Sequence, residues 1–524
     1  MDSELGKKPL TPEEVISVQT TRDNGLLEVP SLAALGLEES HVKRNFNMLS
    51  ILALGFNICA SWVGIAASIA FAIAAGGTVS LLYGLLVVVF FNMCIALSLA
   101  ELASVYPTAG GQYHFVSILS PKAYARAFSY TCGFTGVAAW IAISSAVTIA
   151  VSHGIVTIVL RWHPDFSPTH WQEFLLYQAI NVYSFLHNLF LSKRNPLLYD
   201  FGFALSLSAF IVITICCPAV AKEHASSSDV WTSFVNSAAS WPDGVSFFIG
   251  LTTPQFMLLG LDGALHMAEE CLEPEKVVPK ALIATVGVGG VTAFLFAISM
   301  SYCLTDLELV LNSPTGFPIY ALWEQATGSV AAIIVFMTCL TILGLITLHA
   351  INQTSSRLTW SFARDNGLIF PTFLSRMNTR WQVPVYSLLL DHVCIGLIGL
   401  LYLASSTAFN SFINTAEITT LLSVGCPSIL VLWRKRSTEF LPENRSFRLP
   451  NWLGYFVNIA GLIYVALMTV FFCLPTELPV TGANMNYCSV VLAVIFLVGV
   501  GNWFFHARKN YEGPRLDFRR PVED

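Results

Sequence analysis

Charged residues are scarce in this sequence. Asp, Glu, Lys and Arg make up only 11% of its 524 residues, against about 25% in a typical soluble protein. Residues 45–100 contain none of the four, which leaves room for two apolar spans of ~20 residues each. With 55% hydrophobic residues in the whole chain, this scarcity excludes a soluble protein. It predicts an all-α integral membrane protein whose surroundings are the lipid bilayer.

The sequence also lacks the signatures of metal sites and of cleaved leaders. The spacings CxxC and HExxH do not occur, so neither a metal site nor a cofactor is expected. The first ~44 residues have no apolar core of the kind that signal peptides carry. The histidines are scattered, which argues against an enzyme, and the net charge of −6 does not point to nucleic acid or to any other partner.

Cysteine is present but is not arranged as a disulfide framework. Most of the 12 cysteines fall inside apolar runs, where we expect them to pack as small apolar residues rather than to form disulfides. The cysteines in such runs are Cys59, Cys94, Cys132, Cys216, Cys217, Cys339, Cys394 and Cys473.

Apolar runs predict twelve transmembrane helices. Their approximate bounds are 48–75, 79–103, 126–160, 171–192, 196–221, 245–270, 280–304, 328–355, 384–404, 408–433, 452–474 and 486–506. Lys and Arg gather in alternate loops, which by the positive-inside rule places both termini in the cytosol. The chain thus divides into a cytosolic tail (1–44), a membrane domain (45–506) and a second cytosolic tail (507–524).

The sixth span contains a carboxylate between two glycines. Asp262 lies between Gly260 and Gly263, and a charge near the middle of a bilayer costs about 2.5–3.5 kcal/mol on insertion scales and is usually functional. Glycines at this place would let the helix open and expose backbone groups to a cavity.

The first span is similarly rich in small and polar residues. Asn57, Ser61 and Trp62 stand beside the small pair Ala60 and Gly64. Small residues four apart often serve close helix packing alone. However, matched interruptions in two halves of a chain are typical of inverted-repeat transporters. Ends of broken helices can hold a carboxylate, and freed carbonyls with a nearby acid can hold an ammonium group, so an amino acid would suit such a pair.

Three motifs carry a family resemblance. They are Ala100-Glu-Leu-Ala-Ser-Val-Tyr-Pro-Thr-Ala-Gly-Gly-Gln-Tyr113, the stretch from Gly260 through His266 to Lys280, and residues 356–368. Together they resemble permeases of the amino acid–polyamine–organocation superfamily, specifically its fungal amino acid/choline branch. The similarity extends over about residues 45–506.

This resemblance implies a leucine-transporter-like 5+5 inverted repeat with broken helices 1 and 6, followed by two C-terminal helices. It also implies alternating access around a central site. Carried over by position, the substrate-binding residues would be Asn57, Ser61, Trp62, Val63, Gly64, Phe256, Gly260, Leu261, Asp262 and Gly263. Two features depart from the family pattern: many relatives have Glu at the position of Asp262, and the fifth span has no lysine after its start.

Four acidic residues are candidates for coupling or gating. Glu269 and Glu270 would lie ~10–12 Å beyond Asp262 along a resumed helix, where an inner gate with Lys276, Lys280 or a loop arginine is expected. Glu101, at a helix end, is more readily explained by a structural role. Glu417 in the tenth span remains a candidate for coupling or gating. The outer loop 305–327 is expected to be an exterior cap or a gate, and residues 355–367 an interfacial helix.

The sequence therefore predicts a secondary active transporter. It would move a small amine-containing solute, foremost an amino acid such as 4-aminobutyrate, by proton symport. Trp62 and Phe256 could face an ammonium group, with a cation–π attraction of up to ~2 kcal/mol. The alternatives are a choline or polyamine permease and, from another class, a permease-fold nutrient sensor. The plasma membrane is expected ahead of the vacuole.

Overall fold

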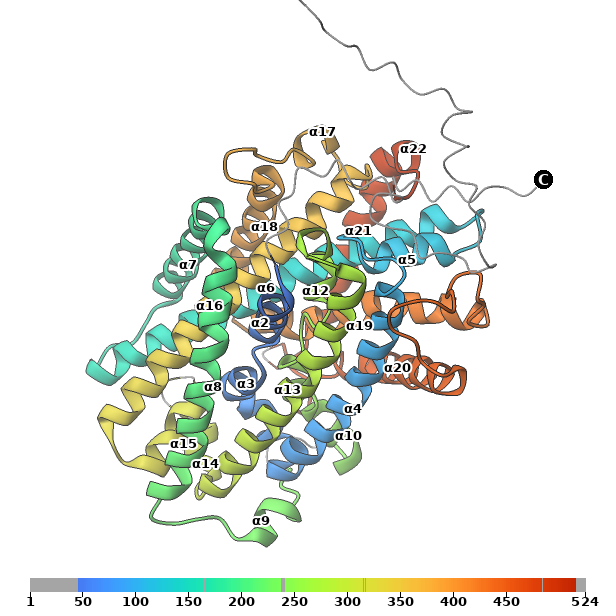
Figure 1. The fold of residues 1–524 in the computed structure, drawn as a ribbon. Helices are drawn as coiled ribbons and strands as arrows, with labels where there is room; N and C mark the ends of the chain where they lie inside the picture. The colour runs from blue at the N-terminus through green and yellow to red at the C-terminus, as the bar shows by residue number, and fades with distance from the viewer. Residues whose placement is uncertain are drawn as a thin grey trace, which may run out of the picture.

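The computed structural model describes residues 46–163, 165–236, 241–313, 315, 317–404, 406–482 and 484–514. The predicted N-terminal tail lies outside these residues, as does the end of the C-terminal one. Within the described part the regular elements are helices, and a few isolated β-bridges occur outside them. Figure 1 shows them gathered into one bundle, with α2 (Met48–Cys59), α3 (Ser61–Ala74) and α12 (Gly263–His266) near its middle.

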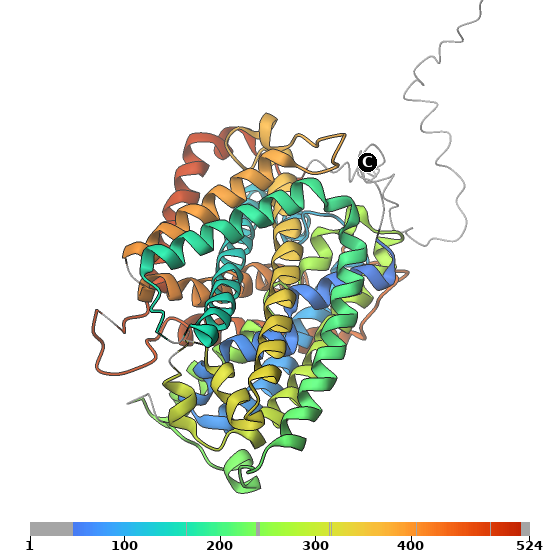
Figure 2. The ribbon, with the colours of Figure 1, turned by 90° about the vertical axis from the view of Figure 1, so that its left-hand side faces the viewer.

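In the described part, nine helical spans are long and apolar enough to cross a membrane. They are built from α2 with α3, α4 (Gly77–Ala103), α6 (Ala125–Trp162), α8 (Asn195–Val220), α13 (Pro274–Cys303), α16 (Val330–Arg364), α19 (Ser406–Trp433), α20 (Asn451–Phe471) and α21 (Cys488–Asn502). Figure 2 shows α16 as a long continuous helix beside α8.

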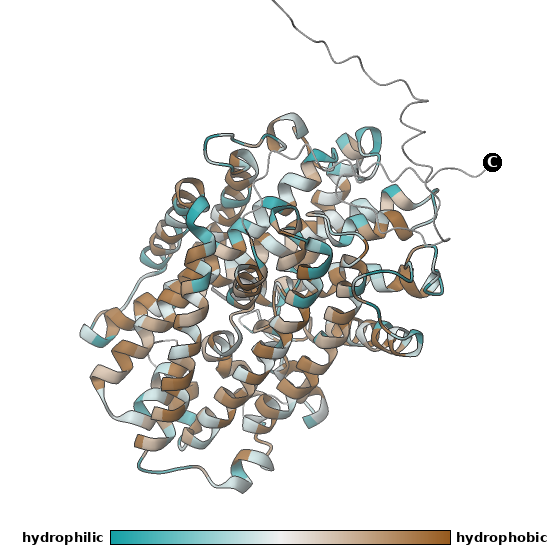
Figure 3. Ribbon diagram, in the orientation of Figure 1, coloured by the Kyte–Doolittle hydropathy of each residue, from teal (hydrophilic) through white to brown (hydrophobic). Residues whose placement is uncertain are grey.

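The remaining three predicted spans correspond to helices that are less regular, less apolar or shorter in their described part. They are α7 (His170–Phe190), α18 (Val385–Ala404) and an interrupted segment from α10 (Asp243–Gly250) to η2 (Ala268–Glu270). Figure 3 shows hydrophobic residues along most helices. Large apolar side chains such as Ile215, Val291 and Phe496 are exposed on the outside of the bundle, which is the pattern of a protein surrounded by lipid.

Two ends of the bundle differ in charge. The basic end, as we call it, holds α5 (Gln112–Leu119), α17 (Pro371–Leu374), α22 (Arg508–Asn510) and the arginine-rich loop 434–450. These elements are tied together, because Arg434 Nε donates to Leu119 O at 2.8 Å and Arg126 Nε donates to Tyr511 O at 2.7 Å. The opposite end holds α9 (Ser227–Trp231), α14 (Leu307–Leu311) and α15 (Pro318–Thr327) (Figure 1).

The first span is interrupted at Ala60. The side chain of Asn47 caps the start of α2 by accepting from Ser50 N at 2.9 Å, and α2 then ends at Cys59 because Ala60 adopts a left-handed φ of 55°. Of the small pair Ala60 and Gly64, the break falls on the alanine and not on the glycine. Non-glycine residues pay roughly 1–2 kcal/mol for this conformation, so tertiary packing must hold it in place.

The sixth span is interrupted more extensively. After α11 (Thr252–Phe256) the chain makes turns through residues 257–262, and Gly260 takes a φ of 75°. Only the short α12 and η2 follow before α13 begins. A left-handed residue is least costly when it is glycine, so here the predicted opening does fall on a predicted glycine.

One expectation about the basic end is wrong. Residues 355–364 do not form a separate interfacial helix, because they are the last turns of α16 and most of them are buried. The guanidinium of Arg364 lies 4.5 Å from the ring centre of Trp360 on the same face. The last span also continues past residue 506 to Asn510, and the buried Tyr511 anchors it.

Candidate functional site

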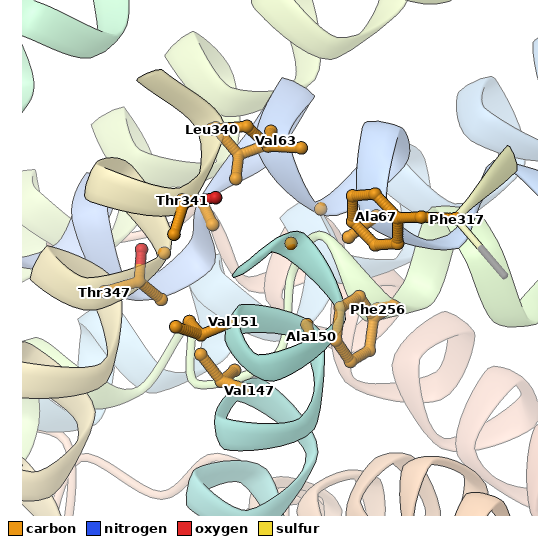
Figure 4. Close-up of a pocket in the computed structure, with 14 residues that line it drawn as sticks. Val63, Ala67, Val147, Ala150, Val151, Phe256, Phe317, Leu340, Thr341 and Thr347 are labelled. Carbon is orange, nitrogen blue, oxygen red and sulfur yellow. The ribbon is translucent and has the colours of Figure 1, made fainter. Parts of the chain in front are cut away.

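A small cavity lies where the first span is interrupted. Its lining comes from α3, α6, α11 and α16, and it includes Ala60 at the break (Figure 4). Phe317, just before α15, also lines the cavity, on the side of the bundle end opposite to the basic end. The loop 305–327, predicted to be an outer one, therefore reaches the interior of the bundle. The cavity measures about 40 Å³, which is room for a few water molecules. It must widen before an organic solute can enter.

The lining of this cavity is apolar and aromatic. Among the described residues no charged side chain lines it, and the side-chain hydroxyl groups there are those of Thr341 and Thr347. Both donate their hydrogens to backbone carbonyls, Thr341 to Met337 O and Thr347 to Asn57 O, each at 2.8 Å. Their oxygens can therefore still accept a hydrogen bond from a ligand. Among the described residues, no carboxylate lines the cavity to pair with an ammonium group.

Three of the ten predicted binding residues line the cavity: Val63, Gly64 and Phe256. The side chain of Asn57 instead donates to Ala53 O at 2.7 Å and to Tyr199 O at 2.8 Å. The hydroxyl of Ser61 lies 3.1 Å from that of Thr292. These two residues bind neighbouring helices together rather than facing the cavity.

Trp62 also points away from the cavity. Its indole Nε1 donates to Ser206 Oγ at 3.0 Å, and its ring centre lies 5.3 Å from that of Phe296. The side chain is fully buried. The cation–π contact expected of Trp62 is thus not available in this conformation, because α8 and α13 already cover the ring.

Gly64 allows the two interrupted spans to touch. A Cβ at this position would lie 2.9 Å from Met257 Cα and 3.1 Å from Met257 Cβ, distances at which backbone must shift. We expect Gly64→Ala to cost about 1–3 kcal/mol by overpacking and to impair any ligand binding at the cavity.

A melting curve and a binding or uptake assay of the purified protein would check this prediction. Gly501→Ala is the matched control, because nothing lies within 4 Å of the Cβ that it adds. Equal loss of melting temperature in the two variants would contradict the close approach.

Gly260, Leu261 and Gly263 of the sixth span are not among the residues that line the cavity. Leu261 is buried. A Cβ at either glycine would lie 2.6 Å from a side-chain carbon of Ile58 on α2. The two glycines therefore allow the sixth span to pack closely against α2, which explains their small size without any contact to a ligand.

Asp262 faces the basic end rather than the cavity. Its Oδ2 accepts from Gln112 Nε2 at 2.5 Å and lies 3.1 Å from His266 Nε2. Its Oδ1 has no hydrogen-bond partner among the described residues, and the side chain is buried. The carboxyl group thus connects α12 to the start of α5.

The contacts of His266 fix the number of protons in this pair. Its Nδ1 lies 2.9 Å from Ala109 O, and a carbonyl oxygen can only accept, so Nδ1 carries a hydrogen. A hydrogen bond between Nε2 and Asp262 Oδ2 then requires one further proton on either atom. The pair is therefore either imidazolium with carboxylate or imidazole with carboxylic acid, and loss of that proton breaks the contact.

Two ion pairs close the basic end beside this pair. Arg364 donates to both oxygens of Glu269 at 3.1 Å, and Arg357 Nε donates to Glu270 Oε1 at 2.7 Å. Both arginines belong to the end of α16. Of the expected partners, Lys276 instead binds Glu273 at 3.2 Å. The arginines thus join η2 to α16 at the basic end.

Glu101 and Glu417 lie elsewhere. Glu101 accepts from Arg436 and Arg445 at 2.6 Å each and from Leu449 N at 3.1 Å, so it anchors the loop 434–450. Glu417 is fully buried on α19, and neither of its carboxyl oxygens has a hydrogen-bond partner among the described residues.

Sequence reasoning did not single out Gln112 or Phe317. Gln112 stands in the quoted motif that ends at Tyr113, but only the fold brings it to Asp262, 150 residues away. Phe317 is one of many phenylalanines, and no local signal distinguishes it.

A polytopic helical membrane protein with two interrupted helices meeting at a central cavity belongs to the class of solute transporters. The comparisons identify the family. The profile of the amino acid permease family matches residues 46–497. The chain belongs to this family, within the amino acid–polyamine–organocation superfamily, whose members are transporters rather than enzymes.

Its curated relatives transport different solutes. The chain is 35% identical to a choline transporter of Saccharomyces cerevisiae, over 97% of this chain and 89% of that protein. It is 28% identical to a 7-keto 8-aminopelargonic acid transporter of the same yeast, over 88% and 92% of the two chains. It is 26% identical to an amino-acid permease of Arabidopsis thaliana, over 92% and 95%.

Proposed function

We propose that this protein is a secondary active transporter that carries a small amine-containing solute by proton symport. The observation that supports this most directly is the meeting of the two interrupted spans: Ala60 and Gly64 of the first and Phe256 of the sixth line one cavity. The proposal of a small amine as the solute rests on the partial charges at the ends of the broken helices and on the solutes named for the relatives.

We further propose a twelve-span topology with a 5+5 repeat. An interrupted span is the first span of each half: α2 with α3 in the first half, and α10 to η2 in the second. The helices α20 and α21 follow the second half. The basic end would face the cytosol, as the positive-inside rule requires. Both termini would be cytosolic, with the plasma membrane as the site of action.

The cavity suits a solute with a positive end wrapped in methyl or methylene groups. The C-terminal carbonyls of α2 give about half a negative charge at Ala60, and Phe256 and Phe317 supply aromatic surface. These features favour a quaternary amine such as choline, as does the named substrate of the yeast relative.

A zwitterion such as 4-aminobutyrate is the second candidate. Ser61 and Trp62 occupy the first positions of α3, where backbone N–H groups have no partner within the helix and can bind a carboxylate. The same break would then hold both ends of an amino acid.

The coupling proton is assigned to the pair of Asp262 and His266. The pair does not contact the cavity directly, and it can hold one proton while linking α12 to Ala109 and Gln112. Protonation stabilises closure of the basic end, and release of the proton breaks one link in that closure. Asp262 thereby acts on the gate rather than on the ammonium group.

Uptake into liposomes tests the proposed function. We expect purified protein to accumulate radiolabelled choline or 4-aminobutyrate when the lumen is alkaline, and the better competitor identifies the preferred solute. Accumulation of no amine, with binding preserved, would instead favour a nutrient sensor. Accumulation that ignores the pH gradient would contradict proton symport.

Phe256→Ala tests the site itself. Loss of an aromatic face worth up to ~2 kcal/mol of cation–π attraction should raise the KM for choline by up to about thirtyfold. Phe496→Ala removes a phenylalanine that is exposed on α21 and should leave the KM unchanged. A normal KM in Phe256→Ala would move the substrate away from this cavity.

A further inference from the structure

Two cysteines flank the loop that joins α20 to α21. Cys473 lies two residues after the end of α20, and Cys488 is the first residue of α21. Both are free thiols in the structure; Cys473 is partly exposed and Cys488 is buried. Cys473 was expected to pack as a small apolar residue, but it lies outside the helix, beside a second thiol.

The two thiols are within hydrogen-bonding range of one another. The backbone on both sides of them is fixed by one side chain. Asn486 Nδ2 donates to Phe472 O at 2.7 Å and to Leu474 O at 3.1 Å, while its Oδ1 accepts from Cys488 N at 3.1 Å. Asn486 therefore holds the neighbours of Cys473 and the amide of Cys488 together, and Cys488 Sγ lies 3.5 Å from the carbonyl oxygen of Phe472, the residue before Cys473. A disulfide requires the two sulfur atoms to approach to about 2.05 Å.

The two thiols also differ in reactivity. The hydrogen bond from the Cys488 thiol lowers the pKa of Cys473, although burial acts in the other direction. Attack on a disulfide requires a thiolate, and Cys473 is the more accessible of the two. Cys473 is thus suited to react first with an external disulfide, and Cys488 is placed to resolve the product.

The loop lies at the end of the bundle opposite to the basic loops. Residues 474–487 contain Glu477 and no Lys or Arg, and Pro475 O accepts from the indole of Trp241 at 3.0 Å, in the segment leading to α10. With the proposed orientation this end faces the lumen of the secretory pathway and then the cell exterior. Disulfides form and persist in those compartments.

We propose that Cys473 and Cys488 form a disulfide that closes the loop between α20 and α21. The oxidant is a disulfide of the secretory pathway, such as an oxidoreductase or glutathione disulfide. The Cys473 thiolate attacks it and releases one thiol. The Cys488 thiolate then attacks the mixed disulfide at Cys473 Sγ and releases the second thiol, so that two protein thiols lose two protons and two electrons and the oxidant is reduced to two thiols.

Counting free thiols in the full-length chain tests the proposal. Cells that express the protein are quenched in acid, and the denatured protein is alkylated with N-ethylmaleimide and weighed. We expect ten of the 12 cysteines to react before reduction and all of them after it. A peptide linking Cys473 to Cys488 should be found in the unreduced digest.

Variants distinguish this pair from the others. Cys473→Ser should leave all of the remaining thiols reactive, whereas Cys59→Ser should still protect two of them. A linked peptide containing Cys132 and Cys426, the neighbouring thiols of α6 and α19, in place of the expected one would overturn the assignment. So would full reactivity of all cysteines before reduction.

The orientation is tested in the same cells. After mild reduction, a membrane-impermeant maleimide should label Cys473 from outside, and Cys473→Ser should remove that label. External labelling combined with free thiols before reduction would reject the disulfide but keep the topology. Absence of external labelling in reduced cells would reject the topology on which the disulfide depends.

Discussion

The variant Asp262→Asn is expected to bind and exchange substrate but to lose accumulation against a gradient. Asparagine has nearly the same shape as aspartate, and both contacts of Asp262 are made by Oδ2. With its amide oxygen in that place, asparagine can still accept from Gln112, while a neutral His266 loses its hydrogen bond to this atom. Its amide cannot take up or release the shared proton. The link between α12 and α5 should therefore survive while the proton coupling is lost.

Two liposome assays separate these effects. Counterflow, in which labelled solute exchanges for unlabelled solute, should retain at least a tenth of the wild-type rate. Uptake driven by a pH gradient should fall to the level of empty liposomes. Asp200→Asn is the control, because it changes a carboxylate that accepts from Ser50 at 3.2 Å, outside the cavity and its gate, and it should preserve accumulation.

Full accumulation by Asp262→Asn would remove this residue from the coupling mechanism. Glu417→Gln would then become the decisive variant, because Glu417 is buried and its carboxyl oxygens have no hydrogen-bond partner in the part of the chain that the structure describes. Loss of accumulation in Glu417→Gln alone would place the proton on α19.

The second large effect is expected from Glu101→Gln. Glu101 is the shared anion of Arg436 and Arg445, and all three side chains are almost completely buried. Removing one partner of a buried ion pair typically costs about 3–5 kcal/mol, because the remaining charge is left uncompensated. Here two arginines would lose their anion at once, so the loop 434–450 should detach from the end of α4.

Melting curves of the detergent-solubilised protein measure this loss. We expect a marked fall in melting temperature and lower yield for Glu101→Gln. Glu443→Gln is the matched control: its partner Arg448 lies 3.5 Å away and both side chains are more than half exposed, so the pair should contribute little to stability. Coincident melting curves for Glu101→Gln and wild type would show that the arginines find other anions.

The membrane spans could be predicted from the sequence because the signal is local. An uncharged run such as residues 45–100 has to satisfy its backbone within a helix in lipid, whatever the rest of the chain does. The glycines around Asp262 likewise allow a break, and Gly260 does adopt a left-handed conformation. The three motifs were enough to identify the family.

The sequence was therefore sufficient to predict where helices and one of their breaks occur, and to which family the chain belongs. The tertiary structure decided which side chains meet. Asp262 reaches Gln112 across 150 residues, Glu269 reaches Arg364 across 95, and Glu101 reaches Arg436 across 335. It also turned Trp62 toward Ser206 and set the first break at Ala60. Such contacts depend on how distant helices rotate and pack against each other, and a local pattern of apolar and polar residues does not specify that rotation.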